Sequence, residues 1–553
     1  MRQKRTSDGL TVNAIAGTHV VTLGLDLADE RRPYCLGFAI QREDHTEGER
    51  YWMSGMKTFA ATDPGLGPGG QTSSRSHPFQ SFQWADYSAK PAHDYSYRVT
   101  ALYGSPANLE ERSTTAVRIS TETELGKPHS VFFNRGSVAS QEYARRFQDK
   151  APGKLSGAMQ TAAYQWLSRG LLEAFETFVQ RANGPTYGLY GAIYEFQWPT
   201  ALKAIKAAAA TGATVRIVYD GIPGNGPLAK NEAAIADQHI KSRCEPRTTG
   251  TIMHNKFVVL TKSGTPVAVW TGSTNLTENG IFGHSNCGHL VEDKNVARAY
   301  LDYWNELRGN PDSAAEKQWM GTHNLSPPDP WSAKITEVFS PHTGLKVLDW
   351  YAAIANGAQR ALFMTFAFGM HKKFQTVYEQ DDGVLRFSLM DKEGSGSALG
   401  QAKKDIRRIR ALPNVVVAVG NRIVTNSFDR WLAERSGLTS NVQWVHSKYM
   451  LVDPLGNTPV VVTGSANFSE PSTNANNENM LVIRGDTRVA DIYLGEFMRL
   501  YSHYAFREAV KIASERGETD WHPEHLVPDE SWQTDYFDPR NQRSLRRRYF
   551  AGT

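Results

Sequence analysis

Two segments of the chain repeat the same set of polar residues at the same spacing. Each segment begins with a histidine. Counted from that histidine, a lysine follows after two residues, a glycine after 18 and an asparagine after 21. These residues are His254, Lys256, Gly272, Ser273 and Asn275 in the first segment, and His446, Lys448, Gly464, Ser465 and Asn467 in the second. The repeat indicates that the chain contains a duplicated unit.

The residue types in the repeat suit the binding of a phosphate group. We expect the histidine and lysine of each segment to share one face of a β-strand, because side chains two residues apart in a strand point to the same side. The glycine lets the backbone approach a ligand closely, and serine and asparagine supply hydrogen-bond donors. Two such units facing each other would surround one cavity with donors and ammonium groups that stabilise charge developing on a reacting phosphorus centre.

These segments resemble the paired His-x-Lys-x4-Asp and Gly-Ser-x-Asn motifs of the phospholipase D superfamily. The second segment matches the full motif through Asp453, and Asn476 with Glu478 resembles the family's downstream Asn-x-Glu element. Two upstream phrases, residues 192–196 and 215–220, are also similar to the first half of the family. The resemblance covers roughly residues 130–505.

The first segment departs from the family pattern at two positions. Thr261 stands where the second segment has Asp453. Asn286 stands at the offset of Glu478, with Cys287 as the alternative if the alignment slips by one residue. Some members of the superfamily, such as tyrosyl-DNA phosphodiesterases, lack the aspartate and are active. The missing glutamate bears more directly on the protonation of the first histidine.

The resemblance implies covalent catalysis by two histidines. One attacks phosphorus to form a phosphohistidine, which water or another alcohol then displaces. By order in the chain, His254 is expected to be the nucleophile and His446 the general acid and then the base. We further predict that Glu478 lies beside His446 and favours its cationic form, and that the Asn286 amide holds a neutral His254.

Phospholipid is the expected substrate, because two motifs fused in one chain resemble bacterial phospholipases D. Transfer to alcohols could accompany hydrolysis. Lys256 and Lys448 already supply positive charge and no metal-ligand cluster is evident, so we expect neither a metal nor another cofactor.

Two alternatives to a phospholipase remain open. A nuclease acting on DNA or RNA is the first, although such members are often single short units that dimerise, whereas this chain is duplicated, carries a net charge of only +4 and is expected to be a monomer. The second is a non-catalytic phosphate-binding protein. Intact His254 and His446 argue against it.

The composition is that of a globular protein. The 553 residues are 40% hydrophobic and include 13 Trp, 22 Tyr and 24 Phe, which excludes a mostly disordered chain. No run approaches the ~20 apolar residues that a membrane-spanning helix needs. Three cysteines are too few for a disulfide framework, and the basic N-terminus lacks a signal-peptide core. We therefore expect a cytoplasmic location, with export by a non-classical route left open.

The elements that must position the motifs fall into four parts. We predict an α/β protein with an all-β sandwich over 1–125, loosely resembling a fibronectin type III domain, and two fused phospholipase D-like halves over 126–326 and 327–510 with pseudo-twofold symmetry. A C-terminal extension covers 511–553. Strand–helix–strand order in both halves predicts largely parallel sheets with the active site at the seam. Residues 158–182 carry the pattern of an amphipathic helix.

Other charged residues receive a structural interpretation. Glu195 is interpreted as a solvated carboxylate, with a role in the site as the less favoured alternative. His284 and His289 are interpreted as structural or exposed. The basic stretch 401–411 is interpreted as the solvated face of a helix.

The C-terminal extension mixes aromatic residues with arginines. It could contact nucleic acid or an anionic membrane surface. Packing on its own domain through Trp532, Tyr536 and Phe537 is the interpretation we place first.

Overall fold

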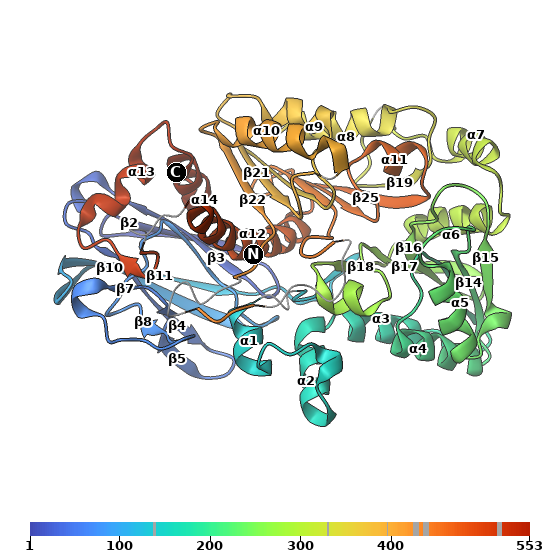
Figure 1. Cartoon of the computed structure of the whole chain (residues 1–553), viewed down its shortest axis with the longest axis horizontal. Coiled ribbons are helices and arrows are strands. Elements are labelled where there is room, and N and C mark those ends of the chain that lie inside the picture. Colours follow the sequence, from blue (N-terminus) through green and yellow to red (C-terminus); the bar gives the residue numbers. More distant parts are fainter. Residues whose placement is uncertain (137–139, 329–330, 395, 424–430, 435–441, 517–521) are drawn as a thin grey trace.

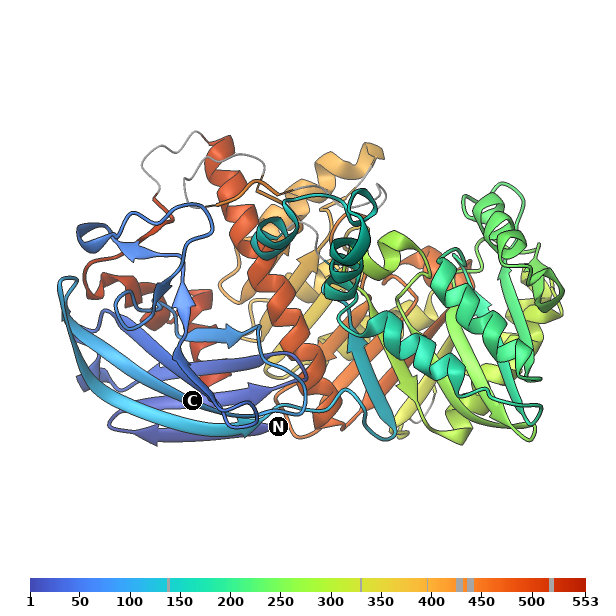
Figure 2. The ribbon, with the colours of Figure 1, turned by 90° about the horizontal axis from the view of Figure 1, so that it is seen from below.

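A computed structural model describes residues 1–136, 140–328, 331–394, 396–423, 431–434, 442–516 and 522–553. Three sheet-containing parts lie side by side: an all-β part, drawn in blue in Figure 1, and two α/β halves, one mainly green and one yellow to orange. The long helix α12 (Thr487–Glu515) runs through the middle of the molecule beside the all-β part (Figure 2).

The N-terminal part, called here the β part, contains two antiparallel four-stranded sheets. Their orders are β1-β2-β3-β9 and β11-β10-β4-β5. The strands are β1 Arg2–Ser7, β2 Leu10–Ala16, β3 Val21–Leu27, β4 Gly37–Asp44, β5 Glu49–Trp52, β9 Gln83–Asp86, β10 Asp94–Ser105 and β11 Asn108–Ser120, and the short strands are β6 Ser54–Gly55, β7 Thr58–Phe59 and β8 Thr72–Ser73. The predicted all-β part is present, and its resemblance to fibronectin type III stays a prediction.

The C-terminal extension packs on the β part. Its elements are β26 (His525–Leu526), which pairs with β7, α13 (Thr534–Phe537) and α14 (Gln542–Ala551). The Trp532 indole N–H donates to the Cys35 carbonyl at 2.8 Å, and its ring stacks on Phe82. Arg547 pairs with Asp26 of β3. The preferred interpretation of the extension, packing on the protein itself through Trp532, Tyr536 and Phe537, is confirmed.

The two α/β halves have the same sheet topology. The orders are β12-β18-β17-β16-β13-β14-β15 and β19-β25-β24-β23-β20-β21-β22. The first sheet has β12 His129–Phe133, β13 Tyr187–Ile193, β14 Thr214–Asp220, β15 Cys244–Arg247, β16 Lys256–Lys262, β17 Thr265–Gly272 and β18 Cys287–Val291; the second has β19 Ile335–Ser340, β20 Ala361–Phe366, β21 Leu385–Met390, β22 Val415–Val419, β23 Tyr449–Val452, β24 Val460–Gly464 and β25 Glu478–Arg484. Position by position, the duplication inferred from the motifs extends to whole sheets.

Both sheets are mixed, so the prediction of largely parallel sheets is wrong. Only the two pairings at one edge of each sheet are parallel, for example β13 with β14 and β14 with β15. The strands that follow the motifs return directly as hairpins. Between β16 and β17 the turn residues Ser263 and Gly264 both have positive φ, the geometry of a tight two-residue hairpin.

The core that joins the halves lies between the two sheets. Helix α6 (Lys294–Arg308) and helix α12 fill this space, and Tyr300, Phe363 and Phe497 belong to one buried cluster that spans both halves. The remaining helices are α1 Gln141–Phe147, α2 Gly157–Ser168, α3 Leu171–Gln180, α4 Pro199–Ala210, α5 Leu228–Asp237, α7 Ser313–His323, α8 Lys346–Asn356, α9 Lys372–Tyr378, α10 Leu399–Arg410 and α11 Glu470–Asn474. Helices α3 and α4 pack on the outer face of the first sheet, and α8, α9 and α10 on that of the second.

Two helical predictions have different outcomes. The segment 158–182 forms two helices, because Arg169 and Gly170 both adopt left-handed backbone conformations between α2 and α3. The basic stretch 401–411 is one helix, α10, which buries Ile406 and Ile409 and exposes its charged side, as predicted. Among the described residues, no helix combines the length and the apolar character needed to cross a bilayer.

Candidate active site

The two halves are joined at the motif histidines by backbone hydrogen bonds. The His254 N–H donates to the Asn477 carbonyl at 2.9 Å, and the His446 N–H donates to the Ser285 carbonyl at 3.3 Å. Short β-bridges form at both places. Each motif histidine therefore lies beside the downstream segment of the opposite half.

Because the halves meet in this way, each imidazole has its hydrogen-bond partner in the opposite half. The Nδ1 atom of His254 lies 2.8 Å from Oε2 of Glu478, and Nδ1 of His446 lies 2.8 Å from Oδ1 of Asn286. The prediction that Glu478 accompanies His446 and that Asn286 accompanies His254 is wrong. Equal offsets along the sequence identify the partner residues, but the contact between the halves decides which histidine each one meets.

The motif serines hold these partners in place. The Ser465 hydroxyl donates to Glu478 at 2.6 Å, and the Ser273 hydroxyl donates to the Asn286 carbonyl oxygen at 2.8 Å. Each serine oxygen in turn accepts a backbone N–H from the strand opposite. Both serines are fully buried, so they orient the partners of the imidazoles instead of facing a ligand.

The motif lysines lie at the beginning of the strands. Lys256 is the first residue of β16 and Lys448 directly precedes β23, so both histidines stand before the strand and not within it, unlike the prediction. Each ammonium group donates to the carbonyl of its own motif histidine. Burial lowers the pKa of Lys256 to about 8. Burial together with the charge of Lys256 lowers the pKa of Lys448 well below its usual value. An anion placed between them would relieve this repulsion.

One cavity of about 690 Å³ receives residues from both halves. His254 and Asn275 line it from the first half, and His446 and Asn467 from the second. The side-chain oxygens of Asn275 and Asn467 are buried without a hydrogen-bond partner among the described residues. The predicted histidines and asparagines therefore do meet at the seam.

Both imidazoles are held as neutral rings. Burial lowers the pKa of His254 to about 4 despite the opposing charge of Glu478, and burial with the Lys448 charge lowers the pKa of His446 well below its usual value. Glu478 is ionised, because its contacts with His254 and Lys256 outweigh its burial and lower its pKa. In each ring the Nδ1–H is donated to the partner, which leaves the Nε2 lone pair available.

Two segments of the chain, residues 179–308 and 397–501, match the family model described as "Cardiolipin synthase, PLD-like domain". The chain therefore contains two phospholipase D-like domains, one in each α/β half. Each matched segment contains one of the two histidine–lysine motifs.

Solved structures similar to this chain share little sequence with it. Phosphatidylserine synthase from Haemophilus influenzae Rd KW20 is 12% identical, with 62% of this chain and 91% of that chain covered and a TM-score of 0.41. Yeast tyrosyl-DNA phosphodiesterase is 11% identical, with 57% and 88% covered and a TM-score of 0.32. Polyphosphate kinase from Porphyromonas gingivalis is 13% identical, with 58% of this chain but only 43% of that chain covered and a TM-score of 0.36. No curated protein sequence matches the chain.

The first phospholipase D-like domain adds acidic and aromatic groups to the cavity wall. Glu195 accepts a hydrogen bond from the Asn275 amide at 2.5 Å, and burial raises the pKa of its carboxyl. Its interpretation as a solvated carboxylate is therefore wrong. The Tyr194 ring lies 4.9 Å from the ring of His254 and 5.1 Å from the ammonium of Lys256. Both residues follow β13, the strand paired with β16.

A third imidazole, His284, was not recognised from the sequence as part of the site. It lines the cavity with its ring centroid 4.6 Å from that of His446, and its Nδ1 accepts from the Asn286 amide at 3.0 Å. Its offset from His254 equals that of Asn476 from His446, which is a signal the sequence does contain. His289 is buried away from the cavity, as its structural interpretation requires.

Asp453 lies outside the group of residues that meet at the cavity. Its carboxylate accepts backbone N–H groups of Gln359, Arg360 and Ala361, at the end of β23 away from His446. It fixes the turn that leads into β20. Thr261, its counterpart in the first domain, is buried at the corresponding end of β16.

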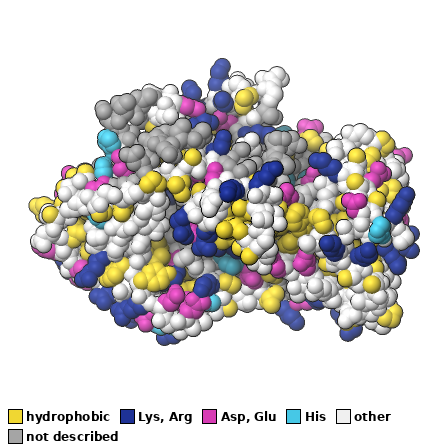
Figure 3. Space-filling model, turned by 60° about the horizontal axis from the view of Figure 1, so that its bottom comes forward, with side chains coloured by type: hydrophobic (Ala, Val, Ile, Leu, Met, Phe, Trp, Pro, Cys, Tyr) yellow, Lys and Arg dark blue, Asp and Glu magenta, His cyan; other side chains and the backbone are white. Residues whose placement is uncertain are grey.

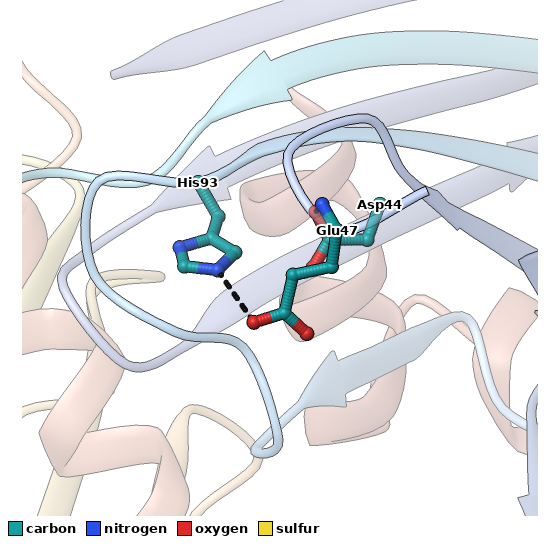
Figure 4. A group of neighbouring side chains, drawn as sticks. All are labelled: Asp44, Glu47 and His93. Atoms are coloured by element: carbon teal, nitrogen blue, oxygen red, sulfur yellow. Dashed lines mark hydrogen bonds and ion pairs between the residues drawn. The ribbon is translucent and has the colours of Figure 1, made fainter. Parts of the chain in front are cut away.

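The β part holds a separate group of possible metal ligands. Ligand atoms of Asp44, Glu47 and His93 lie within 4.8 Å of one another (Figure 4). Glu47 already pairs with Lys90, and Asp44 accepts two backbone N–H groups of the following turn. We interpret the group as a stabilised turn.

Proposed function

We propose that this protein is a phosphodiesterase that hydrolyses phospholipid head-group phosphodiesters through a phosphohistidine intermediate. One observation carries the proposal. Two imidazoles from two domains line one cavity, and each is anchored through Nδ1 so that Nε2 is available. A buried ammonium group, Lys256 or Lys448, is bonded to the backbone carbonyl of each of these histidines. This arrangement suits covalent catalysis at phosphorus.

In the first step, His254 is the nucleophile. Its Nε2 lone pair forms a bond to phosphorus while the bond from phosphorus to the head-group oxygen breaks. The Glu478 carboxylate accepts the Nδ1–H and supports the positive charge that develops on the ring. Lys256 and Lys448 would stabilise the phosphoryl oxygens.

His446 transfers the protons in both steps. The bound phosphate anion favours the protonated form of His446, which then gives its Nε2 proton to the leaving oxygen. In the second step neutral His446 takes a proton from water, the water oxygen bonds to phosphorus, and the phosphorus–nitrogen bond breaks. An alcohol in place of water would give transfer instead of hydrolysis.

The walls of the cavity support a lipid substrate over a nucleic acid. Its described lining residues include the carboxylates Glu195 and Glu278 and a single cation, Lys230. Binding to a nucleic-acid backbone uses an extended set of cations. The opposite wall carries Phe368, which is 47% exposed, together with Val442. One phosphodiester with an apolar neighbour fits this arrangement better than a polyanion.

Head-group release from phosphatidylcholine and phosphatidylethanolamine vesicles in EDTA tests the proposal. Single-stranded DNA is the parallel substrate, and H254A and H446A are the control variants. We expect lipid turnover that survives chelation and is lost in both variants. DNA cleavage without lipid turnover would overturn the substrate, and loss on chelation with rescue by a divalent cation would overturn the metal-independent mechanism.

A further inference from the structure

A second pocket, of about 790 Å³, lies where the β part meets the first phospholipase D-like domain and α12. Trp84 and Tyr51 line it from the β part, Trp166 from α2, and Arg499 from α12. It shares no lining residue with the cavity that holds the two motif histidines. Figure 3 shows Lys and Arg side chains, in dark blue, gathered near the junction of the β part, on the left, with the rest of the molecule.

Arginines outnumber carboxylates around this pocket. Arg169 and Arg499 both pair with Glu496, at 2.8 and 2.6 Å. Arg145 and Arg146 both pair with Glu142, at 2.7 and 2.5 Å. Two guanidinium groups on one carboxylate leave one positive charge uncompensated in each trio.

The other acidic lining residue does not offset this excess. Asp86 pairs with the buried Arg42 at 2.9 Å and also accepts the Tyr97 hydroxyl. Its charge is therefore already neutralised within the β part.

Arg135 adds a third positive charge, and no ion pair joins it to a carboxylate among the described residues. Its guanidinium lies 4.6 Å over the Trp166 ring, and its Nε is buried without a hydrogen-bond partner. Burial and the charges of the neighbouring arginines, Arg169 first, lower its pKa to about 9. A guanidinium fixed on an indole face, with its buried Nε unpaired among the described residues, is prepared for an anion.

We propose that this pocket is a second anion-binding site, which takes the phosphate group of a small phosphorylated ligand with Arg135 as its main ligand. A planar guanidinium matches phosphate oxygens in a bidentate geometry. The excess charge of the two arginine pairs favours an anion with more than one negative charge. Trp84, Tyr51 and Trp166 offer flat apolar surfaces for the rest of the ligand.

Binding is a better readout than activity for this site. Arg135 directly follows Asn134, whose side-chain oxygen accepts the backbone N–H of Asn286. Asn286 in turn holds His446. A change at Arg135 could therefore alter turnover even if no ligand bound there.

Calorimetric titration of the full chain with inorganic phosphate tests the proposal. The wild-type protein should bind phosphate at two sites, and the K256M/K448M variant should keep the site at Arg135. R135Q should lose that site, with affinity falling at least about tenfold. The matched control is R112Q, because Arg112 also lies over an aromatic ring, 4.8 Å from Tyr103, but on β11 outside the pocket. R112Q should bind like wild type.

Two results would each contradict the proposal. Unchanged binding in R135Q, or no phosphate binding in K256M/K448M, would overturn the proposal. If thermal unfolding shows that R135Q does not fold, R135K takes its place, because it keeps the charge but loses the bidentate geometry and should bind more weakly. Soluble dihexanoyl phosphatidate, run beside inorganic phosphate, shows whether a lipid head group or free phosphate is the preferred source of the anion.

Discussion

The two phospholipase D-like domains share a sheet order and a motif spacing, yet they treat their histidines differently. His254 is held by the ionised Glu478, whereas His446 is held by the neutral amide of Asn286. A carboxylate supports a ring that becomes positive as it attacks, and an amide orients a ring without fixing its charge. Duplication thus places two histidines at equivalent positions. The difference between Glu478 and Asn286 as their partners gives the two histidines different proposed roles.

The cavity walls differ in the same way. Ile193 lies opposite Lys256 in the first sheet. In the second sheet Met364 pairs with Met450, and continuing this register by two residues places Phe366 opposite Lys448. Two residues further on, Glu195 and Phe368 occupy equivalent positions. One side of the cavity is therefore acidic and the other apolar, and a substrate would bind in a single orientation.

Removing each imidazole in turn should have the largest effect on turnover and should separate the roles of the two histidines. We expect H254A to lose all turnover, and H446A to lose about 10²–10⁴-fold with a poor leaving group but far less with p-nitrophenol, which needs no protonation. Steady-state rates with both types of ester measure this. Equal losses with both leaving groups in H446A would contradict its role as an acid.

Giving both imidazoles an amide partner should have the next largest effect on turnover. E478Q replaces the carboxylate beside His254 with an amide, the type of partner that His446 has, and we expect kcat to fall about 10²-fold with KM little changed. Pre-steady-state kinetics should place the loss in formation of the intermediate. N286Q, which keeps an amide beside His446, is the matched control, and a similar loss there would show that packing alone is responsible.

The reverse exchange should move a pH profile. In N286D the new carboxylate lies beside His446 and favours its protonated form, which raises its pKa. The pH dependence of kcat/KM reports the pKa of the acid in the free enzyme, so a raised pKa of His446 should shift the alkaline limb to higher pH. Profiles of wild type and N286D decide this, and a limb that stays or moves to lower pH would contradict the assignment.

The smallest effect should come from the apolar wall. F368A removes the exposed ring, and we expect KM for long-chain phospholipids to rise a few-fold while kcat stays constant. A loss of about 1 kcal/mol of apolar contact corresponds to this change. Dihexanoyl lipids should be unaffected, and equal changes for long and short chains would remove Phe368 from the lipid site.

Much of the fold could be predicted from local sequence patterns. The strand–helix–strand order predicted for both halves is present as β13, α4 and β14 in the first and as β20, α9 and β21 in the second, and the basic stretch 401–411 is a helix. The direction of the strands was harder, because Ser263 and Gly264 form a hairpin that a focus on strand–helix–strand order overlooks. The break at Arg169 and Gly170 is another backbone effect that a helical pattern does not show.

The sequence predicted which residues form the site but not which of them contact each other. Spacing identifies His254, Lys256, His446 and Lys448, because the chemistry requires these types at these intervals. It cannot show that Glu478 crosses to His254, since that contact depends on how two folded domains dock. The inward position of Ser273, behind Asn286, depends on how β17 and β18 pair within the first domain.

Trapping the covalent intermediate tests the central claim most directly. A short-chain phospholipid is mixed with the enzyme, the reaction is quenched at alkaline pH, which preserves phosphohistidine, and the peptides are mapped by mass spectrometry. The proposed mechanism predicts a phosphatidyl group on His254, accumulating in H446A and absent in H254A. A label on His446 instead, or turnover without a label on either histidine, would contradict it.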